Sequence, residues 1–292
     1  MTILNRGTVH INVMEPSAQV ARAHGTARIT AAVRRGRALL TERYTSQPYR
    51  LLVPTPADDE PLTAVLSNLS GGMLNGDIYN VALSLKPQAS LLLTGQAAEK
   101  IYRAADSRMT RVCNTVHVGQ DACLEWLPQG SIQFDGARLY RTNIIHCENT
   151  SRVIAGEILY LGRAAMGERL TCGILRDNWA LFLDDKLVWQ DRMILDQRTM
   201  RSLDDPGAFN GATATAILLC CGLHAVEHLD AAREWMSDAP GLGGATVVNG
   251  VLLMRWLSND AQALRNHFGH VAGRLRYALM GHPSVLPRIW SI

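Results

Sequence analysis

The feature that most constrains folding is an unbroken series of short strand-like segments between residues 10 and 195. Segments such as Thr26–Val33 and Arg138–Cys147 alternate apolar and polar residues, and turn residues separate them at intervals of roughly ten residues. No stretch of this region keeps a helical period. The pattern predicts a mostly β fold, with many short strands wound in a β-helix-like arrangement of stacked sheets.

The last third of the chain contains two segments with helical periodicity. Leu223–Met236 and Ala261–Met280 each place apolar residues on one face. Asp260 or Asn259 is suited to cap the second segment, and Gly281 is suited to end it. We therefore predict two α-helices in the C-terminal third.

Strand signals flank these helices. Ala214–Cys221 and Val247–Leu257 read as strands, and Gly241–Gly244 reads as a flexible connection. The segment Pro283–Trp290 is an extended apolar tail that docks on its own core or on a partner. We expect one domain over residues 1–292, with residues 1–25 as a poorly defined extension.

Composition narrows the class of protein. The chain has 292 residues, is 47% hydrophobic and 19% charged, and has a net charge of +3, so it can bury a core and gives no reason to expect nucleic acid as a partner. Since no apolar run reaches membrane-span length and the N-terminus lacks a signal-peptide core, we expect a cytoplasmic protein without membrane contact. The cysteines form no C-x-x-C pair and are predicted to be buried, reduced thiols: Cys113, Cys123, Cys147, Cys172, Cys220 and Cys221.

Three acidic residues stand against apolar or glycine-rich sequence. Asp77 is the last residue of the glycine-rich stretch Ser70–Asp77. The turn residues alone predict a wide loop with a solvated acid. Glu157 interrupts an apolar strand, and Asp191 lies beside a tryptophan. A carboxylate in a buried strand is costly unless it is paired, solvated or bound to a cation. The simple expectation for Glu157 is a salt bridge, for example to Arg163 or Arg192.

One short motif suggests a metalloenzyme. His224, Glu227 and His228 match the H-x-x-E-H pattern, which would place two imidazoles one turn apart on a helix. A third protein ligand is not evident, so an ordinary helix face is the competing interpretation. The chain has no phosphate-binding P-loop and no G-x-S-x-G elbow. The sequence gives no positive evidence for a catalytic site.

Five motifs in a fixed order carry a family resemblance. They are Gly71-Gly72-x-x-x-Gly76-Asp77, Gln96-Ala97-Ala98-x-Lys100-Ile101-Tyr102-Arg103, Leu124-Glu125-Trp126-Leu127-Pro128-Gln129, Leu161-Gly162-Arg163-x-x-x-Gly167-Glu168 and Ser284-Val285-Leu286-Pro287-Arg288-Ile289-Trp290. From about residue 25 to residue 292, the chain resembles the urease accessory protein UreD family, called UreH in some bacteria.

The resemblance implies a non-enzymatic scaffold. Members of this family bind UreF, which recruits the GTPase UreG, and the assembly docks on apo-urease and delivers nickel. The implied cargo is nickel(II) in transit through an internal water-filled channel, with no permanently bound cofactor. The resemblance places Asp77, Glu157 and Asp191 along that channel. It also implies a mostly β winding with two helices.

Several points stay open from the sequence. Glu99 departs from the family pattern, and it either pairs with Lys100 or Arg103 or adds a carboxylate to the channel. The apolar surface that docks on partners is expected to include the Pro283–Trp290 tail. A homodimer within the assembly is left undecided. The alternatives are a metal-dependent hydrolase that uses His224, Glu227 and His228, and a β-rich binding module without a metal role.

Overall fold

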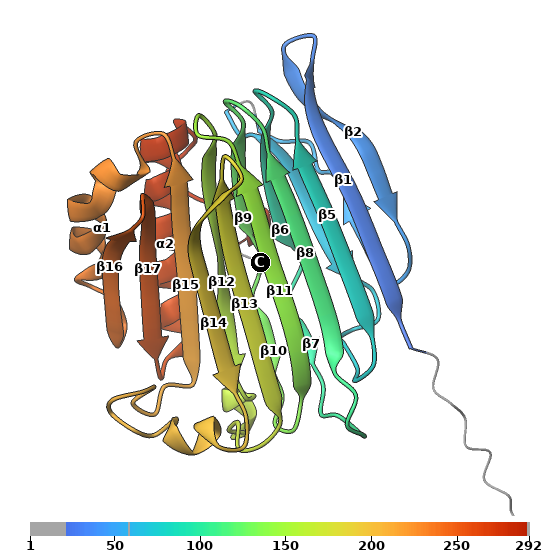
Figure 1. The fold of residues 1–292 in the computed structure, drawn as a ribbon, viewed down its shortest axis with the longest axis vertical. Helices are drawn as coiled ribbons and strands as arrows, with labels where there is room; N and C mark the ends of the chain where they lie inside the picture. Colours follow the sequence, from blue (N-terminus) through green and yellow to red (C-terminus); the bar gives the residue numbers. More distant parts are fainter. Residues whose placement is uncertain (1–21, 58, 291–292) are drawn as a thin grey trace, which may run out of the picture.

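The computed structural model describes residues 22–57 and 59–290, and it consists of two stacked β-sheets with helices on one side (Figure 1). Sheet A has seven strands in the spatial order β14 (Lys186–Leu195), β13 (Ile174–Leu183), β11 (Arg138–Cys147), β8 (Thr110–Val118), β5 (Ile78–Leu85), β1 (His24–Arg34) and β2 (Arg37–Thr45). Sheet B has ten strands, of which eight follow the order β16 (Leu242–Val248), β17 (Val251–Ser258), β15 (Ala214–Gly222), β12 (Arg152–Leu161), β9 (Cys123–Leu127), β6 (Ser90–Gly95), β4 (Leu62–Asn68) and β3 (Tyr49–Leu52). Two short strands, β10 (Ser131–Gln133) and β7 (Glu99–Ile101), extend from β12.

The chain winds between the two sheets as a solenoid. Each coil contributes one strand to sheet B and then one long strand to sheet A. The coils are formed by β4 and β5, by β6 and β8, by β9 and β11, and by β12 and β13. Strands of consecutive coils pair in parallel in both sheets, and antiparallel strands such as β14 and β15 close one end of the winding. The predicted β-helix-like arrangement is confirmed.

Alternation along each strand decides which side chains enter the space between the sheets. In β11, Leu139, Arg141, Asn143 and Ile145 are buried, and the intervening residues are partly exposed. The same period of two applies in β8 and β13. Any polar residue at an inward position is therefore placed in the interior.

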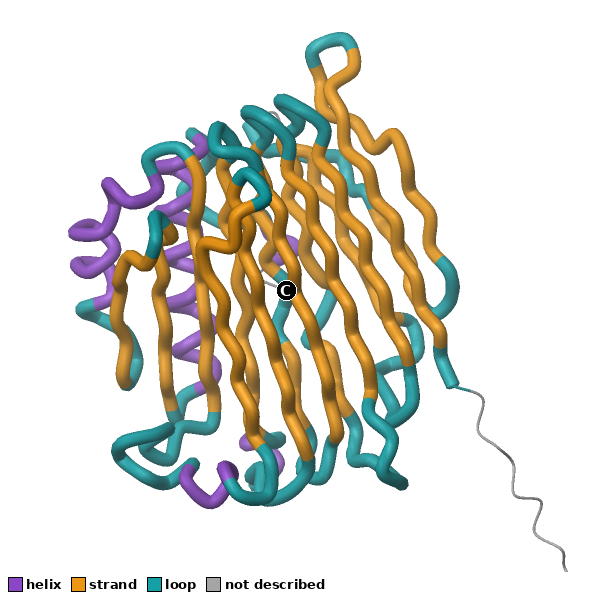
Figure 2. The backbone as a smooth tube through the Cα atoms, viewed as in Figure 1, coloured by secondary structure: helices purple, strands orange, loops and turns teal. Residues whose placement is uncertain are grey.

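The longer helix has the predicted bounds and packs on the outer face of sheet B. In α2 (Ala261–Met280), the Asp260 side chain accepts a hydrogen bond from the Ala263 N–H at 2.8 Å, and Gly281 ends the helix at φ 71°. Phe268 packs against Trp256 of β17 in a second hydrophobic core. The helices gather at one side of the molecule (Figure 2). Within residues 22–57 and 59–290, no helix has the length and apolar character needed to span a membrane.

Two expectations about the C-terminal third are wrong in detail. Residues 223–228 do not join the first helix: His224 has φ 64°, a 3₁₀ turn covers Ala225–His228, and α1 spans only Leu229–Met236. The glycines of 241–244 do not form a flexible connection, since most of them lie in β16, which pairs with β17 as a hairpin around Asn249-Gly250. Further 3₁₀ turns cover Ala164–Met166, Thr199–Ser202 and Arg288–Trp290.

The C-terminal tail docks on its own core. Leu286 is 6% exposed and Trp290 is 3% exposed, and the Trp290 Nε1–H donates to the Leu127 carbonyl at 3.1 Å. Val285 is the exposed exception. The expectation that this tail forms an exposed apolar docking surface is therefore wrong for its large anchoring side chains.

Candidate functional site

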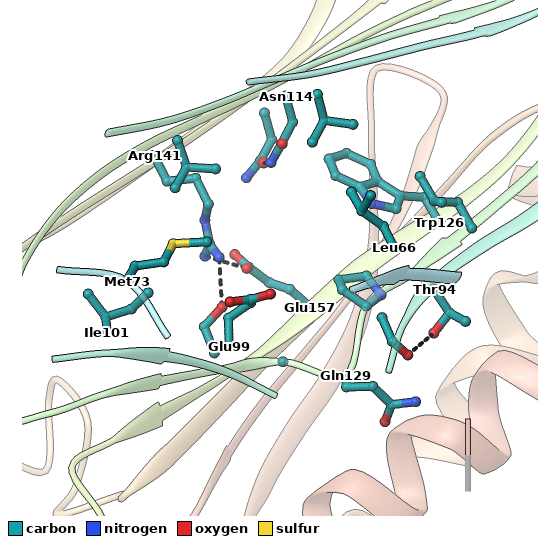
Figure 3. Close-up of a pocket in the computed structure, with 18 of the residues that line it drawn as sticks. Leu66, Met73, Thr94, Glu99, Ile101, Asn114, Trp126, Gln129, Arg141 and Glu157 are labelled. Atoms are coloured by element: carbon teal, nitrogen blue, oxygen red, sulfur yellow. Dashed lines mark hydrogen bonds and ion pairs between the residues drawn. The ribbon is translucent and has the colours of Figure 1, made fainter. Parts of the chain in front are cut away.

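A cavity of about 110 Å³ lies between the two sheets, and its wall combines apolar and polar side chains (Figure 3). Met73, Ile101, Leu66 and Trp126 supply much of the apolar wall. The polar side chains that line it are Thr94, Glu99, Asn114, Gln129, Ser131, Arg141, Asn143 and Glu157. In the view of Figure 3, Glu99, Glu157 and Arg141 converge on the same part of the cavity.

A buried ion cluster forms one end of this cavity. Arg141 and Asp177 are register partners on β11 and β13, and both side chains are buried. The Arg141 Nε–H donates to Asp177 Oδ1 at 2.8 Å, and its Nη1–H donates to Ser131 Oγ at 3.0 Å. Arg141 also forms an ion pair with Glu157, which enters from β12 on the opposite sheet. The partner of Glu157 is thus Arg141, not Arg163 or Arg192.

Trp179 fixes the two carboxyl groups relative to each other. Its Nε1–H is shared between Glu157 Oε1 at 3.1 Å and Asp177 Oδ2 at 3.3 Å. Asn143 Nδ2 donates to Asp177 Oδ1 at 3.4 Å, and Asn143 Oδ1 accepts a hydrogen bond from Asn114 Nδ2 at 2.7 Å. The cluster is a connected network, and Asn114 is joined to its charged groups through Asn143.

One buried cation faces two carboxyl groups, so the two carboxyl groups titrate differently. Burial raises the pKa of Glu157 well above its ordinary value; Arg141 opposes this effect and Asp177 adds to it. Burial would also raise the pKa of Asp177, but Arg141 and the hydrogen bonds from its neighbours bring it below the ordinary value. Of the two carboxyl groups, Glu157 is therefore the one that holds a proton more tightly, and Asp177 is the one that ionises more readily.

Glu99 adds a further carboxyl group to the same cavity. It lies on β7 and accepts a hydrogen bond from Asn68 Nδ2 at 3.1 Å, and burial raises its pKa. Arg103 pairs with Asp135 instead, and no ion pair joins Glu99 to Lys100 among the described residues. Of the two expectations for Glu99, the geometry matches the one that adds a carboxylate to the interior.

A second, smaller cavity of about 40 Å³ adjoins the cluster from the other side. Glu157 and Trp179 line both cavities, and Asp191 and Arg255 line the second. Asp191 pairs with Arg255 at 2.9 Å. Glu157 and Asp191, two of the three acids predicted from the sequence to line a channel, therefore line the same smaller cavity.

Asp77 lies elsewhere, at the entry to β5. It is 3% exposed, and its carboxylate accepts from the Ala23 N–H at 2.9 Å, the Leu74 N–H at 2.8 Å and the Tyr79 hydroxyl at 3.3 Å. It lines neither of the two cavities. The local interpretation of a solvated acid is wrong, since this carboxylate organises the glycine-rich loop from inside.

The glycine-rich loop and the segment around Tyr102 pack against each other. A Cβ atom on Gly72 would lie 2.5 Å from the Tyr102 ring, and the Tyr102 hydroxyl donates to the Gly71 carbonyl at 2.8 Å. Met73 pairs with Ile101 as a parallel bridge, and both side chains line the larger cavity. The first two motifs thus build one wall of the cavity, with Gly76 and the exposed Lys100 at its periphery.

The turn motif near residue 162 has a structural explanation. A Cβ atom on Gly162 would lie 2.6 Å from the Glu168 carbonyl oxygen, and Gly162 has φ 94°. Arg163 Nε donates to Glu168 at 3.1 Å, and its guanidinium stacks over Phe134 at 4.5 Å. These groups close the turn at the C-terminal end of β12.

The histidine motif does not form a metal-binding helix face. His224 and Glu227 are exposed, and Nδ1 of His224 lies 2.7 Å from Oε1 of Glu227. His228 precedes α1. Across the described ranges, no group of three or more His, Cys, Asp or Glu residues is arranged to hold a metal ion.

The cysteines follow the prediction only in part. All six are free thiols, but only Cys147, Cys220 and Cys221 are buried. Cys113 is exposed on the outer face of sheet A, and the other two are partly exposed. None of the six lines either of the two cavities.

Sequence reasoning missed Arg141 and Asp177, the partners that complete the cluster. In β11, Arg141 occupies a buried position between the buried residues Leu139 and Asn143. In β13, Asp177 occupies a buried position between the buried residues Leu175 and Trp179. Their inward positions in two adjacent alternating strands were the available signal.

Comparison with known proteins finds one family that matches this chain. The family model described as "UreD urease accessory protein" matches residues 23–291. A protein named "Urease accessory protein UreD" from Magnetococcus marinus is 38% identical over 274 residues, which cover 92% of this chain and 94% of the relative. Relatives of the same name from Granulibacter bethesdensis and Rhizobium johnstonii are 36% identical (82% of this chain, 99% of the relative) and 30% identical (93% and 96%).

Proposed function

Because the chain belongs to the UreD family of urease accessory proteins, we propose that it is a non-catalytic scaffold which, with UreF and UreG, docks on apo-urease and delivers nickel(II). The observation that carries this proposal is the pair of interior cavities that meet at Glu157. Their position between the sheets suits a path for a small cation. The assembly is proposed to work in the cytoplasm.

The donor set of the cavities suits passage of a metal better than its storage. The described residues that line them offer carboxyl oxygens, amide groups, hydroxyls and the thioethers of Met73 and Met193, and include no histidine or cysteine. Nickel(II) binds imidazole and thiolate ligands tightly, whereas oxygen ligands with water exchange more readily. A transit site must be favourable enough for entry and weak enough for exit. Glu99, Glu157 and Asp191 meet this requirement as successive oxygen donors.

Arg141 acts in this proposal as the cation that a metal replaces. Its guanidinium forms ion pairs with Asp177 and with Glu157. A divalent ion near Glu157 would favour loss of the carboxyl proton and compete with Arg141 for both acids. Metal entry is thereby coupled to proton release and to a shift of the Arg141 side chain. In the second cavity, Arg255 forms an ion pair with Asp191, and a metal would compete with Arg255 for that acid in the same way.

The test of transit is nickel loading of urease with charge-neutral variants. Glu157→Gln keeps the size of the side chain and removes the ionisable oxygen. Glu227→Gln is the matched control, because Glu227 is exposed and lies outside both cavities. We expect Glu157→Gln to lower the nickel content of urease severalfold at limiting nickel, while the accessory complex still assembles. Equal loading by both variants would remove Glu157 from the route.

The test of the scaffold role is assembly. Co-expression with UreF should give a soluble complex that associates with apo-urease. Failure to detect either association, with all components folded, would refute the scaffold proposal. Loss of function in the Glu227→Gln control, with metal bound to the purified wild-type chain at His224, would instead favour the hydrolase alternative.

A further inference from the structure

The outer face of sheet A and the turn beside it carry several arginines that form no salt bridge with a described residue. One row crosses adjacent strands in register: Ile78 on β5, Arg111 on β8, Tyr140 on β11, Arg176 on β13 and Ile194 on β14. Arg111 and Arg176 are exposed, and the Arg111 guanidinium lies 5.8 Å from the centre of the Tyr140 ring. This row lies on the face of the sheet that is turned away from sheet B.

A shallow hollow of about 560 Å³ continues this row beyond the ends of the strands. Arg138, Arg198 and Arg201 line it, together with one acid, Asp196. Asp196 already accepts hydrogen bonds from the N–H groups of Arg198 and Thr199. We call the residues Arg111, Arg138, Arg176, Arg198 and Arg201 the arginine face.

The charges of this face are unbalanced locally. None of its five arginines makes a salt bridge with another described residue, although ion pairs are frequent elsewhere on the surface, as for Arg28 with Glu42 and Arg163 with Glu168. The chain as a whole has a net charge of only +3. Without these five arginines, the other 24 Lys and Arg residues of the chain are outnumbered by its 26 Asp and Glu residues, so this face is more basic than the rest of the chain.

We propose that the arginine face docks an acidic surface of a partner protein. A protein partner is favoured over a polyphosphate, because the arginines alternate with Ile78, Tyr140 and Ile194, and Arg, Tyr and apolar side chains together are typical of protein interfaces. A nucleic-acid surface would be expected in a more strongly basic chain. The inference rests on the proposed function only in naming UreF and apo-urease as the partners to test.

The decisive variant reverses two charges at the centre of the face. Arg111→Glu/Arg176→Glu is compared with Arg34→Glu/Arg37→Glu, which reverses two exposed arginines at the hairpin between β1 and β2 on the far edge of the same sheet. Arg111→Gln/Arg176→Gln separates loss of charge from repulsion. Thermal unfolding of each variant establishes that it folds.

Binding of the full chain to UreF and to apo-urease is measured at low and high salt. We expect the face variant to weaken one of these affinities by about tenfold or more at low salt and to flatten its salt dependence, because repulsion replaces attraction. The hairpin variant should bind as the wild type does. Unchanged affinity for both partners in the face variant would overturn the proposal.

A probe that needs no urease component keeps the proposal testable if the proposed function fails. If the wild type binds neither UreF nor apo-urease, binding of a labelled poly-glutamate peptide decides the question. Loss of binding only in the face variant supports the arginine face as a site for acidic polypeptide. Equal binding by both variants, or tighter binding of a single-stranded DNA of the same charge, overturns it.

Discussion

Glu157 depends on groups from two strands of the opposite sheet, β11 and β13. Arg141 on β11, Asp177 on β13 and Trp179 two residues further contact it. Because one cation faces two acids in a buried place, the folded state raises the pKa of Glu157 above its value in the unfolded chain. Protonation of this one side chain is therefore linked to stability.

The pH dependence of stability tests this linkage. A carboxyl whose pKa is raised in the folded state binds a proton there that the unfolded chain releases above about pH 4.5. Stability then falls as pH rises from that value toward the folded pKa, by up to about 1.4 kcal/mol per pH unit. Glu157→Gln should lack this decline. Urea unfolding of both proteins across pH 4.5–8 measures the difference. Parallel plots of unfolding free energy against pH would contradict a raised pKa of Glu157.

A separate prediction concerns the contribution of Asp77 to stability. Asp77→Ala leaves the Ala23 and Leu74 N–H groups without their acceptor in a buried place, so we expect a loss of about 2–4 kcal/mol in the free energy of unfolding. Asp77→Asn retains one acceptor oxygen and should lose less. Denaturant unfolding distinguishes the two. If Asp77→Ala is as stable as the wild type but loads less nickel into urease, the carboxylate belongs to the transit route instead.

At the scale of elements, α2 is joined to the rest of the molecule by one fully buried arginine. Arg276 Nε donates to Glu125 on β9 at 2.7 Å, and its Nη2 donates to Glu60 at 2.6 Å. Its Nη1 donates to the carbonyls of Pro283 and Val285 at 3.1 and 2.9 Å. A single guanidinium thus connects the helix, sheet B, the loop before β4 and the C-terminal tail.

Removal of this guanidinium should destabilise the C-terminal third. Arg276→Met removes the guanidinium from the buried Glu125 and leaves it the hydrogen bond with His282, which is expected to cost about 3–5 kcal/mol. Arg274→Met, two residues away on the exposed side of α2, is the matched control. Thermal unfolding and limited proteolysis at the tail report the effect. Similar midpoints for both variants would show that Arg276 is not the anchor.

At the scale of the whole molecule, the solenoid has a stable centre and weaker ends. The strands β8, β11, β9 and β12 have partners on both sides and supply much of the core between the sheets, whereas β2 and β16 are edge strands with mostly exposed side chains. The larger cavity is lined in part by β8, β9, β11 and β12, whereas the smaller cavity is lined in part by β14, β15 and β17, toward one end of the winding.

Hydrogen exchange should follow this order. Amides of β8, β11, β9 and β12 should exchange only through global unfolding, and those of β2 and β16 should exchange faster by orders of magnitude, because edge strands open locally. Exchange mass spectrometry on the UreF-bound or free chain measures this. Uniform protection across sheet A would contradict a stability gradient along the solenoid.

The sequence alone determined the features that depend on neighbouring residues. Alternation of apolar and polar residues predicted the strands, and Asp260 and Gly281 predicted the bounds of α2. Glu157 was identified as an acid within an apolar strand. The five ordered motifs indicated the family. Each of these signals is contained within a few residues of the chain, where local sterics and periodicity act.

Tertiary structure decided which of these residues meet. Arg141 and Asp177 are 36 positions apart, and only parallel pairing of successive coils places them side by side opposite Glu157. The same winding brings Asp191 to the second cavity, turns Asp77 into a buried acceptor for the glycine-rich loop and packs the tail on α2. Such contacts depend on strand register across coils, because a shift of one residue would turn every inward side chain outward.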